Sequence, residues 1–279
     1  MTLVTRFAPS PTGYLHRGHA YSALTAFEAA RAAGGRFILR IEDIDATRCR
    51  PEYEAAILED LAWLGLCWEE PIRRQSQHLA DYKVAIAGLR DPGLVYRCFK
   101  TRKEIDIGRA PHEPAVAYVG APLSAAEEAE RLSRGEPFAW RLSLAAARET
   151  LGGFDALTFV EEGVDQSSPR TVQALPETAG DIVLARKDVG VAYHLAVVHD
   201  DALQGVTHVI RGEDLFEATH IQRLLQALLG LPTPIYRHHG LLTGPDGKRY
   251  AKRDKAQTLR ELRASGVTAS ALRAELGFE

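Results

Sequence analysis

The chain has 279 residues, 46% of them hydrophobic, and is therefore long enough for one full hydrophobic core and a smaller second one. Its 34 Lys and Arg residues against 37 Asp and Glu residues give a net charge of -3, which excludes nucleic-acid binding through a uniformly basic surface. Three separated cysteines exclude a disulfide framework and a four-cysteine zinc module, and no apolar run reaches the ~18 residues that cross a membrane. We therefore expect a cytoplasmic globular protein with no membrane partner.

The first third of the sequence predicts a βαβ unit. Residues 3–8 read as a strand, a helix runs from about Arg17 to a Gly-Gly stop, and residues 36–42 read as a second strand. A strand, a crossover helix and a strand of these lengths are typical of a parallel sheet. Two further helices are expected, one that opens at Pro51 and one over residues 77–89.

The remaining sequence predicts an insertion followed by a return to the main fold. From Arg97 to about Gln173 the pattern loosens, with Ala-, Glu- and Arg-rich stretches among Gly and Pro. Three apolar runs of strand length follow, namely DIVLARKD, GVAYHLAVV and THVIRG. A helix that buries Ile221, Leu224, Leu225 and Leu228 comes next, and two short helical segments end the chain.

Two histidines stand where the first loop enters the first helix, in the run His16-Arg17-Gly18-His19. The free N–H groups and dipole of a helix N-terminus attract phosphate, and Gly18 leaves room for a phosphate or a flat base near the backbone. A bare His-x-Gly-His is more often a pair of half-exposed histidines at a helix start. A zinc site is weaker still, because no third ligand follows at a suitable spacing.

A second basic cluster lies on a loop rich in Gly, Pro and Asp near the end of the chain. Its members are Lys248, Arg249, Lys252, Arg253 and Lys255. Such a cluster is usually a solvated loop or a non-specific nucleic-acid patch. A lysine loop can also bind a triphosphate and neutralise the charge that develops as pyrophosphate leaves.

Together the two motifs resemble the paired signature of class I aminoacyl-tRNA synthetases, His-x-Gly-His followed by a Lys-Met-Ser-Lys-Ser loop. Five blocks in chain order are similar to the glutamyl-tRNA synthetase branch: RFAPSPTGYLHRGH, GGRFILRIEDID, WLGLCWEE, HVIRGEDL and GKRYAKRD. The short chain and the segment YHLAVVHDD look like the short paralogue family, the glutamyl-Q tRNA(Asp) synthetases. Members that charge glutamate tRNA carry a long C-terminal anticodon-binding region.

The resemblance implies an α/β fold, a Rossmann-like class I synthetase catalytic domain with a parallel sheet. Residues 1–96 and 176–256 should form its two halves, with the phosphate loop in the second half. Residues 97–175 should form an inserted α+β acceptor-type subdomain with a degenerate zinc site. Residues 257–279 should be a short helical C-terminus without an anticodon-binding domain.

The implied activity is ATP-dependent activation of L-glutamate to glutamyl adenylate without tRNA. Glutamate is then transferred to queuosine at the first anticodon position of tRNA(Asp). The implied partners are L-glutamate, ATP and queuosine-containing tRNA(Asp), with Mg2+ accompanying ATP, and a monomer is expected. Three alternatives stay open: a truncated or split glutamyl-tRNA synthetase that charges tRNA(Glu), a small-molecule adenylyltransferase, and a catalytically inactive RNA-binding module.

The resemblance also assigns roles to the two motifs. It makes His16, His19 and Lys252 the catalytic residues, and it implies that the same three bind ATP together with Gly18 and Arg249. Arg249, Tyr250 and Ala251 occupy the Lys, Met and Ser positions of the signature loop. Charge is therefore kept at the first position, whereas the loss of the hydroxyl puts the closing motion of the loop in doubt.

The glutamate pocket is implied to come from both halves of the sheet. Its expected residues are Arg6, Phe7, Ala8, Pro9, Ser10, Glu42, Tyr193 and Arg211. Arg6 offers a guanidinium that grips carboxylate, and Glu42 would receive the ammonium group. Without the resemblance, Arg6 reads as a strand-edge arginine, Glu42 as an exposed glutamate and Tyr193 as a core aromatic residue.

A zinc site of the family is degenerate in this sequence. Many members hold zinc with Cys-x-Cys, a Tyr and a further Cys; Cys98 and Tyr118 remain, whereas Lys100 and Pro122 replace the other two ligands. A cation at a ligand position opposes Zn2+, so we predict that zinc is absent. The insertion should then be held by apolar packing of Tyr96, Phe99, Phe138 and Trp140.

Overall fold

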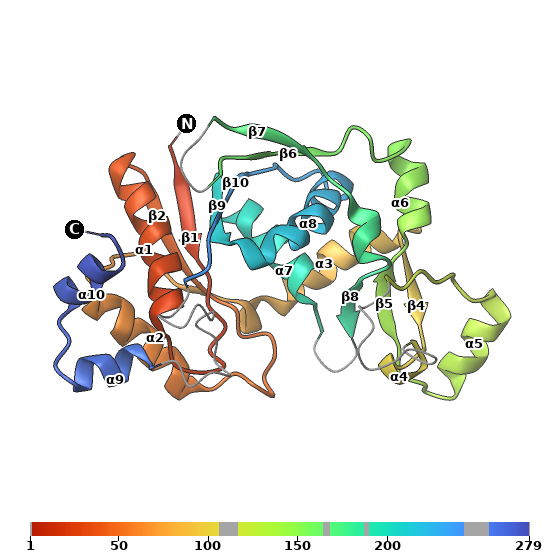
Figure 1. Cartoon of the computed structure of the whole chain (residues 1–279). Helices are drawn as coiled ribbons and strands as arrows, with labels where there is room; N and C mark the ends of the chain where they lie inside the picture. Colours follow the sequence, from red (N-terminus) through yellow and green to blue (C-terminus); the bar gives the residue numbers. More distant parts are fainter. Residues whose placement is uncertain (1, 106–116, 164–167, 187–189, 243–256, 279) are drawn as a thin grey trace.

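The computed structural model describes residues 2–105, 117–163, 168–186, 190–242 and 257–278. Figure 1 shows a larger α/β part that contains the first and last described residues and a smaller part at the right of the view. Each part is built around its own strands. Within the described ranges, no helix is both long and apolar enough to cross a membrane.

The first half of the main sheet is the expected βαβ unit. Strand β1 (Val4–Phe7) pairs in parallel with β2 (Arg36–Ile41), which pairs in parallel with the short strand β3 (Arg73–Arg74). Helix α1 (Arg17–Ala32) connects β1 to β2 and ends just before Gly34, whose positive φ of 59° terminates the helix. Every residue of β1 is buried, and the prediction from the sequence is confirmed here.

The second half of the main sheet contains β9 (His208–Gly212), β10 (Ile235–His239) and β6 (Thr158–Glu161), all parallel, with β7 (Arg170–Gln173) antiparallel at the edge. Strand β10 was not predicted from the sequence. Its five residues, IYRHH, hold only two apolar side chains, so they carry little of the alternation that identifies a strand.

Strands β1 and β9 lie side by side and join the two halves. The amide of Thr207 donates to the carbonyl of Val4 at 3.0 Å, and the guanidinium of Arg6 donates to the carbonyl of Ile210 at 3.4 Å. The strand order is therefore β3-β2-β1-β9-β10-β6-β7. The order reverses between β1 and β9, and ligands of such sheets bind at this switch point, beyond the carboxyl ends of the strands.

A separate antiparallel sheet forms the smaller part. It contains β4 (Val95–Cys98), β5 (Ala139–Leu142) and β8 (Val183–Arg186), with helices α4 (Arg102–Ile105), α5 (Ala125–Ser133) and α6 (Leu144–Leu151) around it (Figure 1). The pairing does not follow the expected boundaries at residues 97 and 175. Strands β6 and β7 belong to the main sheet although they fall within residues 97–175. Strand β8 belongs to the antiparallel sheet although it comes after residue 175. The division into four ranges therefore stays a proposal, with the second sheet extending from β4 to β8.

Helices cover both sheets. Those not yet named are α2 (Pro51–Trp63), α3 (Leu79–Arg90), α7 (Tyr193–Leu203), α8 (Phe216–Leu228), α9 (Leu259–Ala264) and α10 (Ala269–Glu275), with 3-10 turns at Gln75–His78, Pro176–Ala179 and Glu213–Leu215. The expectation that GVAYHLAVV forms a strand was wrong. Four consecutive residues of α7, 195–198, are buried, so the helix is covered on several sides and lacks the periodicity that separates a helix from a strand.

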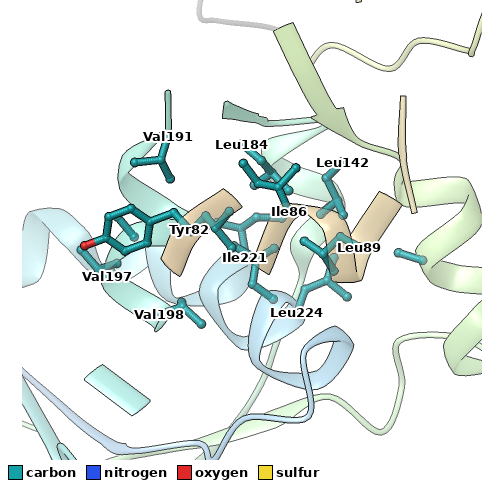
Figure 2. Close-up of a cluster of buried hydrophobic side chains, with 14 of the residues drawn as sticks. Tyr82, Ile86, Leu89, Leu142, Leu184, Val191, Val197, Val198, Ile221 and Leu224 are labelled. Carbon is teal, nitrogen blue, oxygen red and sulfur yellow. The ribbon is translucent and has the colours of Figure 1, made fainter. Parts of the chain in front are cut away.

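One hydrophobic cluster joins the two parts. Figure 2 shows Tyr82 of α3 and Leu142 of β5 packed with side chains of α7 and α8, among them Ile221 and Leu224. As the sequence predicted, Ile221, Leu224 and Leu225 are buried, whereas Leu228 is only half-buried. A second cluster lies under α1 and includes residues of α9 and α10, so the last helices pack on the main sheet's first half.

Three of the four degenerate zinc positions, Cys98, Lys100 and Tyr118, lie close together. The Sγ atom of Cys98 is 3.9 Å from the hydroxyl of Tyr118, and the ammonium of Lys100 lies 5.7 Å from the centre of the Tyr118 ring. No group of three or more His, Cys, Asp or Glu residues in the described ranges could hold a metal. A lysine and a proline at two of the four ligand positions do not fit Zn2+. The nearby rings of Phe99, Phe138 and Trp140 form a chain with centroids 5.5–5.7 Å apart.

Removing a side chain from the joining cluster should weaken the whole fold. Leu224 is fully buried, so Leu224→Ala leaves a cavity and should lower the free energy of unfolding by about 2–5 kcal/mol. Leu203 at the end of α7 is 59% exposed, and Leu203→Ala should change it by less than about 0.5 kcal/mol. Chemical denaturation measures both, and equal losses would contradict the assigned packing.

Candidate active site

A cavity of about 400 Å3 opens where β1 and β9 end, at the switch point of the main sheet. Most of the residues predicted for the site line it, namely Arg6, Phe7, Ala8, His16, Gly18, His19, Glu42, Tyr193 and Arg211. Pro9 and Ser10 do not. Ser10 lines a neighbouring cavity of about 420 Å3, which shares Glu42 and Tyr193 with the first, and Pro9 lines a smaller hollow beside the β1 loop.

The two imidazoles form the N-terminal cap of α1. The amide of Gly18 donates to Nδ1 of His16 at 3.1 Å, and the amide of His16 donates to Nδ1 of His19 at 3.2 Å. Because both Nδ1 atoms accept, each neutral ring carries its hydrogen on Nε2 and is therefore a hydrogen-bond donor. The ring centroids are 3.8 Å apart, and a Cβ on Gly18 would lie 3.1 Å from the His16 ring. The cap thus presents two donors beside a helix N-terminus.

A buried ion network fixes Arg6. Nε of Arg6 donates to the carboxylate of Asp201 at 3.3 Å, and the same carboxylate accepts a hydrogen bond of 2.7 Å from Arg40. Arg40 is fully buried and also donates to Glu42 at 3.1 Å. Asp201 at α7 therefore connects β1 to β2, and Arg6 enters the cavity from a position set by two other charged residues.

Burial and the neighbouring arginines have opposite effects on the pKa values of Glu42 and Asp201. Burial raises the pKa of Glu42, whereas Arg40 lowers it, and the result is a raised pKa. Burial also opposes the charged form of Asp201, but Arg6 and Arg40 hold its pKa below the ordinary value. Glu42 is thus the carboxylate of the network that gains most from a further cation. It lines both cavities, where an ammonium group would supply that cation.

Arg211, on the neighbouring strand β9, is held by different means. Its Nε donates to Nε2 of His238 at 3.1 Å, and its Nη2 donates to the hydroxyl of Thr219 at 2.7 Å and to the carbonyl of Leu215 at 3.1 Å. Nδ1 of His238 donates to the carboxylate of Glu161 at 2.7 Å. Since Nε2 must accept from Arg211, His238 is neutral in this arrangement. Burial and the Arg211 charge lower its pKa, whereas Glu161 raises it, with a net lowering.

Tyr193 begins helix α7, whereas the sequence placed it in the expected strand GVAYHLAVV. Burial raises the pKa of its hydroxyl, with Arg211 acting in the opposite direction, so the hydroxyl stays protonated at neutral pH. It stands between the two cavities. The neighbouring His194 is held neutral by burial and by Arg211, which lower its pKa to about 4.

Several residues of the site were missed from the sequence. Asp201 and Asp200 were visible as a charged pair at the end of an apolar run, and His238 and His239 as a pair before Gly240. Neither pair has a spacing that identifies its partners, which lie in distant strands. The basic loop with Arg249 and Lys252 falls within residues 243–256, outside the described residues.

Comparison with known proteins identifies the family. Residues 2–277 match the family described as tRNA synthetases class I (E and Q), catalytic domain. The chain belongs to this family. It is an aminoacyl-tRNA synthetase-like ligase with the Rossmann-like α/β fold expected from the sequence, in a family that uses ATP as a substrate.

Relatives of two names share this domain. A glutamyl-Q tRNA(Asp) synthetase from Rhodobacter capsulatus is 47% identical over 284 residues, which cover 99% of this chain and 100% of the relative. A glutamyl-Q tRNA(Asp) synthetase from Deinococcus radiodurans is 41% identical over 99% of this chain and 88% of its own length. A glutamate–tRNA ligase 2 from Dinoroseobacter shibae is 42% identical over 96% of this chain, which spans 59% of that relative.

The fold of this synthetase domain also agrees with a solved structure. The crystal structure of glutamate-tRNA synthetase from Elizabethkingia anophelis superposes with a TM-score of 0.77 at 30% identity. The match covers 91% of this chain and 53% of that one. The chain therefore spans about half the length of the solved glutamate-tRNA synthetase.

Replacing Asp201, the carboxylate at the centre of the network, tests how much its ion pairs contribute to stability. Asp201→Asn keeps the shape of the side chain but removes the charge that compensates Arg6 and Arg40. The free energy of unfolding should fall by about 3 kcal/mol, because a buried charge is left uncompensated. The control is Glu69→Gln, which breaks an exposed pair with Arg36 and should cost less than about 1 kcal/mol. Similar losses in both variants would contradict the role of the network.

Exchanging His238 tests how Arg211 is positioned. His238→Asn keeps an N–H donor near the Nδ1 position for Glu161, but its shorter side chain places no acceptor at the Nε2 position that Arg211 contacts. The KM for glutamate in ATP–pyrophosphate exchange should rise about tenfold, roughly 1.4 kcal/mol, with kcat changed less than threefold. Equal effects on kcat and KM would contradict a positioning role.

The His238→Asn variant also tests the pH dependence of KM for glutamate. His238 faces Glu161 from β6, Arg211 from β9 and, more distantly, Arg6 from β1, with His194 of α7 also near Arg211. Its folded pKa is lowered below 6.5, so the neutral acceptor is present at neutral pH and is lost as the pH falls through that lowered value. KM for glutamate should therefore rise more steeply in the parent protein than in His238→Asn as the pH is lowered from 7.

Proposed function

We propose that this synthetase activates L-glutamate with ATP and transfers the glutamyl group to the queuosine base of tRNA(Asp), and that it needs no tRNA for the first step. The observation that carries the proposal is the first cavity, in which two guanidinium groups, a buried carboxylate and two imidazole donors meet. The two guanidinium groups and the carboxylate complement the two carboxylates and the ammonium group of glutamate. The whole-length similarity to the Rhodobacter capsulatus glutamyl-Q tRNA(Asp) synthetase supports the choice of acceptor.

Glutamate binding follows from the charges around the cavity. Arg6 and Arg211 are each held by hydrogen bonds within the protein and would bind carboxylate oxygens. Glu42 would accept the ammonium group, and its raised pKa would fall on binding because the ligand brings a positive charge. Tyr193 would donate its hydroxyl.

Adenylate formation then needs no covalent intermediate on the protein. An oxygen of the glutamate α-carboxylate attacks the α-phosphorus of ATP, a P–O bond forms, and the bond to pyrophosphate breaks. The Nε2–H donors of His16 and His19 would stabilise charge on the α-phosphate, and Lys252 would stabilise the leaving pyrophosphate. Magnesium would enter bound to the triphosphate.

The second cavity is the place for the acceptor. It shares Glu42 and Tyr193 with the first cavity, so a group bound there reaches the activated carbonyl directly. A hydroxyl of the queuosine diol would attack that carbonyl, an ester bond would form, and AMP would leave with the electrons of the broken acyl–phosphate bond. Ser10, which was expected beside glutamate, lines this second cavity and would face the acceptor.

We also propose that the protein is cytoplasmic and monomeric. Three free cysteines, one of them exposed, support a reducing compartment. Gel filtration with light scattering tests the monomer.

The proposed reaction is tested in two separate steps. Glutamate should drive exchange of labelled pyrophosphate into ATP with no RNA present. Labelled glutamate should then appear on tRNA(Asp) that contains queuosine and stay absent from unmodified tRNA(Asp) and from tRNA(Glu), with a difference of at least a hundredfold. Exchange followed by charging of tRNA(Glu) would show a glutamyl-tRNA synthetase instead. Binding of tRNA without exchange would show an inactive RNA-binding module.

A further inference from the structure

A third cavity, here named the aromatic cavity, lies between α3 and the antiparallel sheet. Its volume is about 340 Å3. Phe138 and Trp140 line it from the β5 side, and Ile86 of α3 and Ala185 of β8 complete its apolar wall. Nothing in the proposed activation of glutamate uses this cavity.

The two rings are held in a fixed arrangement. Phe138 and Trp140 meet edge to face, with centroids 5.5 Å apart and an interplanar angle of 87°. The guanidinium of Arg97 lies 4.5 Å from the centre of the Trp140 ring and 5.2 Å from that of Phe138. Both rings are only half-buried, so each keeps surface for a further contact. Rigid aromatic surface of this kind is what stacks unpaired bases in proteins that bind single-stranded RNA.

Positive charge surrounds the rings. Lys83 and Arg90 of α3 and Arg186 of β8 line the cavity and are exposed, and its described lining contains no acidic residue. Arg90 pairs with Asp91, whereas Lys83 forms no ion pair within the described ranges. The chain as a whole carries a net charge of -3, so this concentration of cations is local. Cations around stacking surfaces match the phosphates and bases of a nucleic-acid strand.

The three cavities are connected in a row by shared residues. Glu42 and Tyr193 line both the first and the second cavity, and Arg186 lines both the second cavity and the aromatic cavity. The second cavity and the aromatic cavity therefore adjoin at Arg186, where a strand with its reacting nucleotide in the second cavity would reach the aromatic cavity. This continuity, with the charge and the rings, selects RNA over an apolar peptide as the occupant.

We propose that the aromatic cavity binds an anticodon-loop nucleotide next to the one that receives glutamate. Its base stacks on Trp140 and Phe138, and Lys83, Arg90 and Arg186 contact the adjoining phosphates. This inference rests on the proposed function, because it takes the second cavity as the acceptor site. It assigns to α3 and to the second sheet a role in holding the loop.

The test measures binding of an anticodon stem-loop of tRNA(Asp) to the full chain, with and without queuosine. The double variant Lys83→Glu/Arg90→Glu should weaken binding at least tenfold and reduce the dependence of log Kd on log salt by about two. Trp140→Ala should weaken binding about tenfold, with partial recovery in Trp140→Phe. Arg31→Glu, which exchanges an exposed cation of α1, is the control and should leave binding unchanged.

Glutamate-dependent pyrophosphate exchange, measured on the same variants, separates this inference from the proposed function. Exchange should keep its parent rate in all of them, which also shows that they are folded. If the double variant and Trp140→Ala bind the stem-loop as the parent does, the inference is overturned whatever the enzyme charges. If binding falls as expected but the parent protein does not glutamylate queuosine-containing tRNA(Asp), the RNA site stands and the proposed function fails.

Discussion

The active-site half of the fold depends on one buried interaction, the ion network between Arg40 of β2 and the aspartates that end α7. Arg40 has no exposed surface, and neither has Asp200. Charges in such a place must be paired, and here the pairs connect strands that are far apart in the sequence. Asp200 also accepts hydrogen bonds from Arg73, Gln75 and Tyr82, all between 2.8 and 2.9 Å, so β3 and α3 join the same network.

Two different sets of contacts thus hold the charged residues of the first cavity. Ion pairs hold Arg6 and Glu42, whereas a neutral imidazole between Glu161 and a guanidinium holds Arg211. All of these contacts are made between residues of this chain. A pocket with its charges already oriented loses little free energy in reorganising when its ligand arrives. This preorganisation is consistent with the proposed activation of glutamate in the absence of tRNA.

The second sheet is followed closely in the chain by a helix that lines the first cavity. Strand β8 carries Arg186 at its end, and α7 begins a few residues later with Tyr193. The chain therefore passes from the smaller part of the molecule to the edge of the first cavity within one short connection. The hydrophobic cluster in Figure 2 supports this connection, because α7 packs against α3 and α8 there. An RNA held at the second sheet would be positioned relative to the pocket by a packed core.

The sequence by itself determined the elements that depend on local pattern. The βαβ unit followed from apolar spacing and a glycine stop, and the histidine pair followed from its place at a helix start. The family resemblance added Arg6, Glu42, Tyr193 and Arg211, all of which line the cavity. These features could be predicted because each depends on neighbours within a few residues or on a motif in chain order.

Tertiary structure alone decided the rest. It made YHLAVVHDD a helix, because burial on several sides removes the periodicity that the sequence would otherwise show. It joined β6 and β7 to the main sheet, and it paired Asp201 with Arg6 and His238 with Arg211 across 195 and 27 residues of chain. The physical reason is that a buried charge pairs with the groups that lie within a few ångströms of it in the folded core. A single sequence does not show which residues those are.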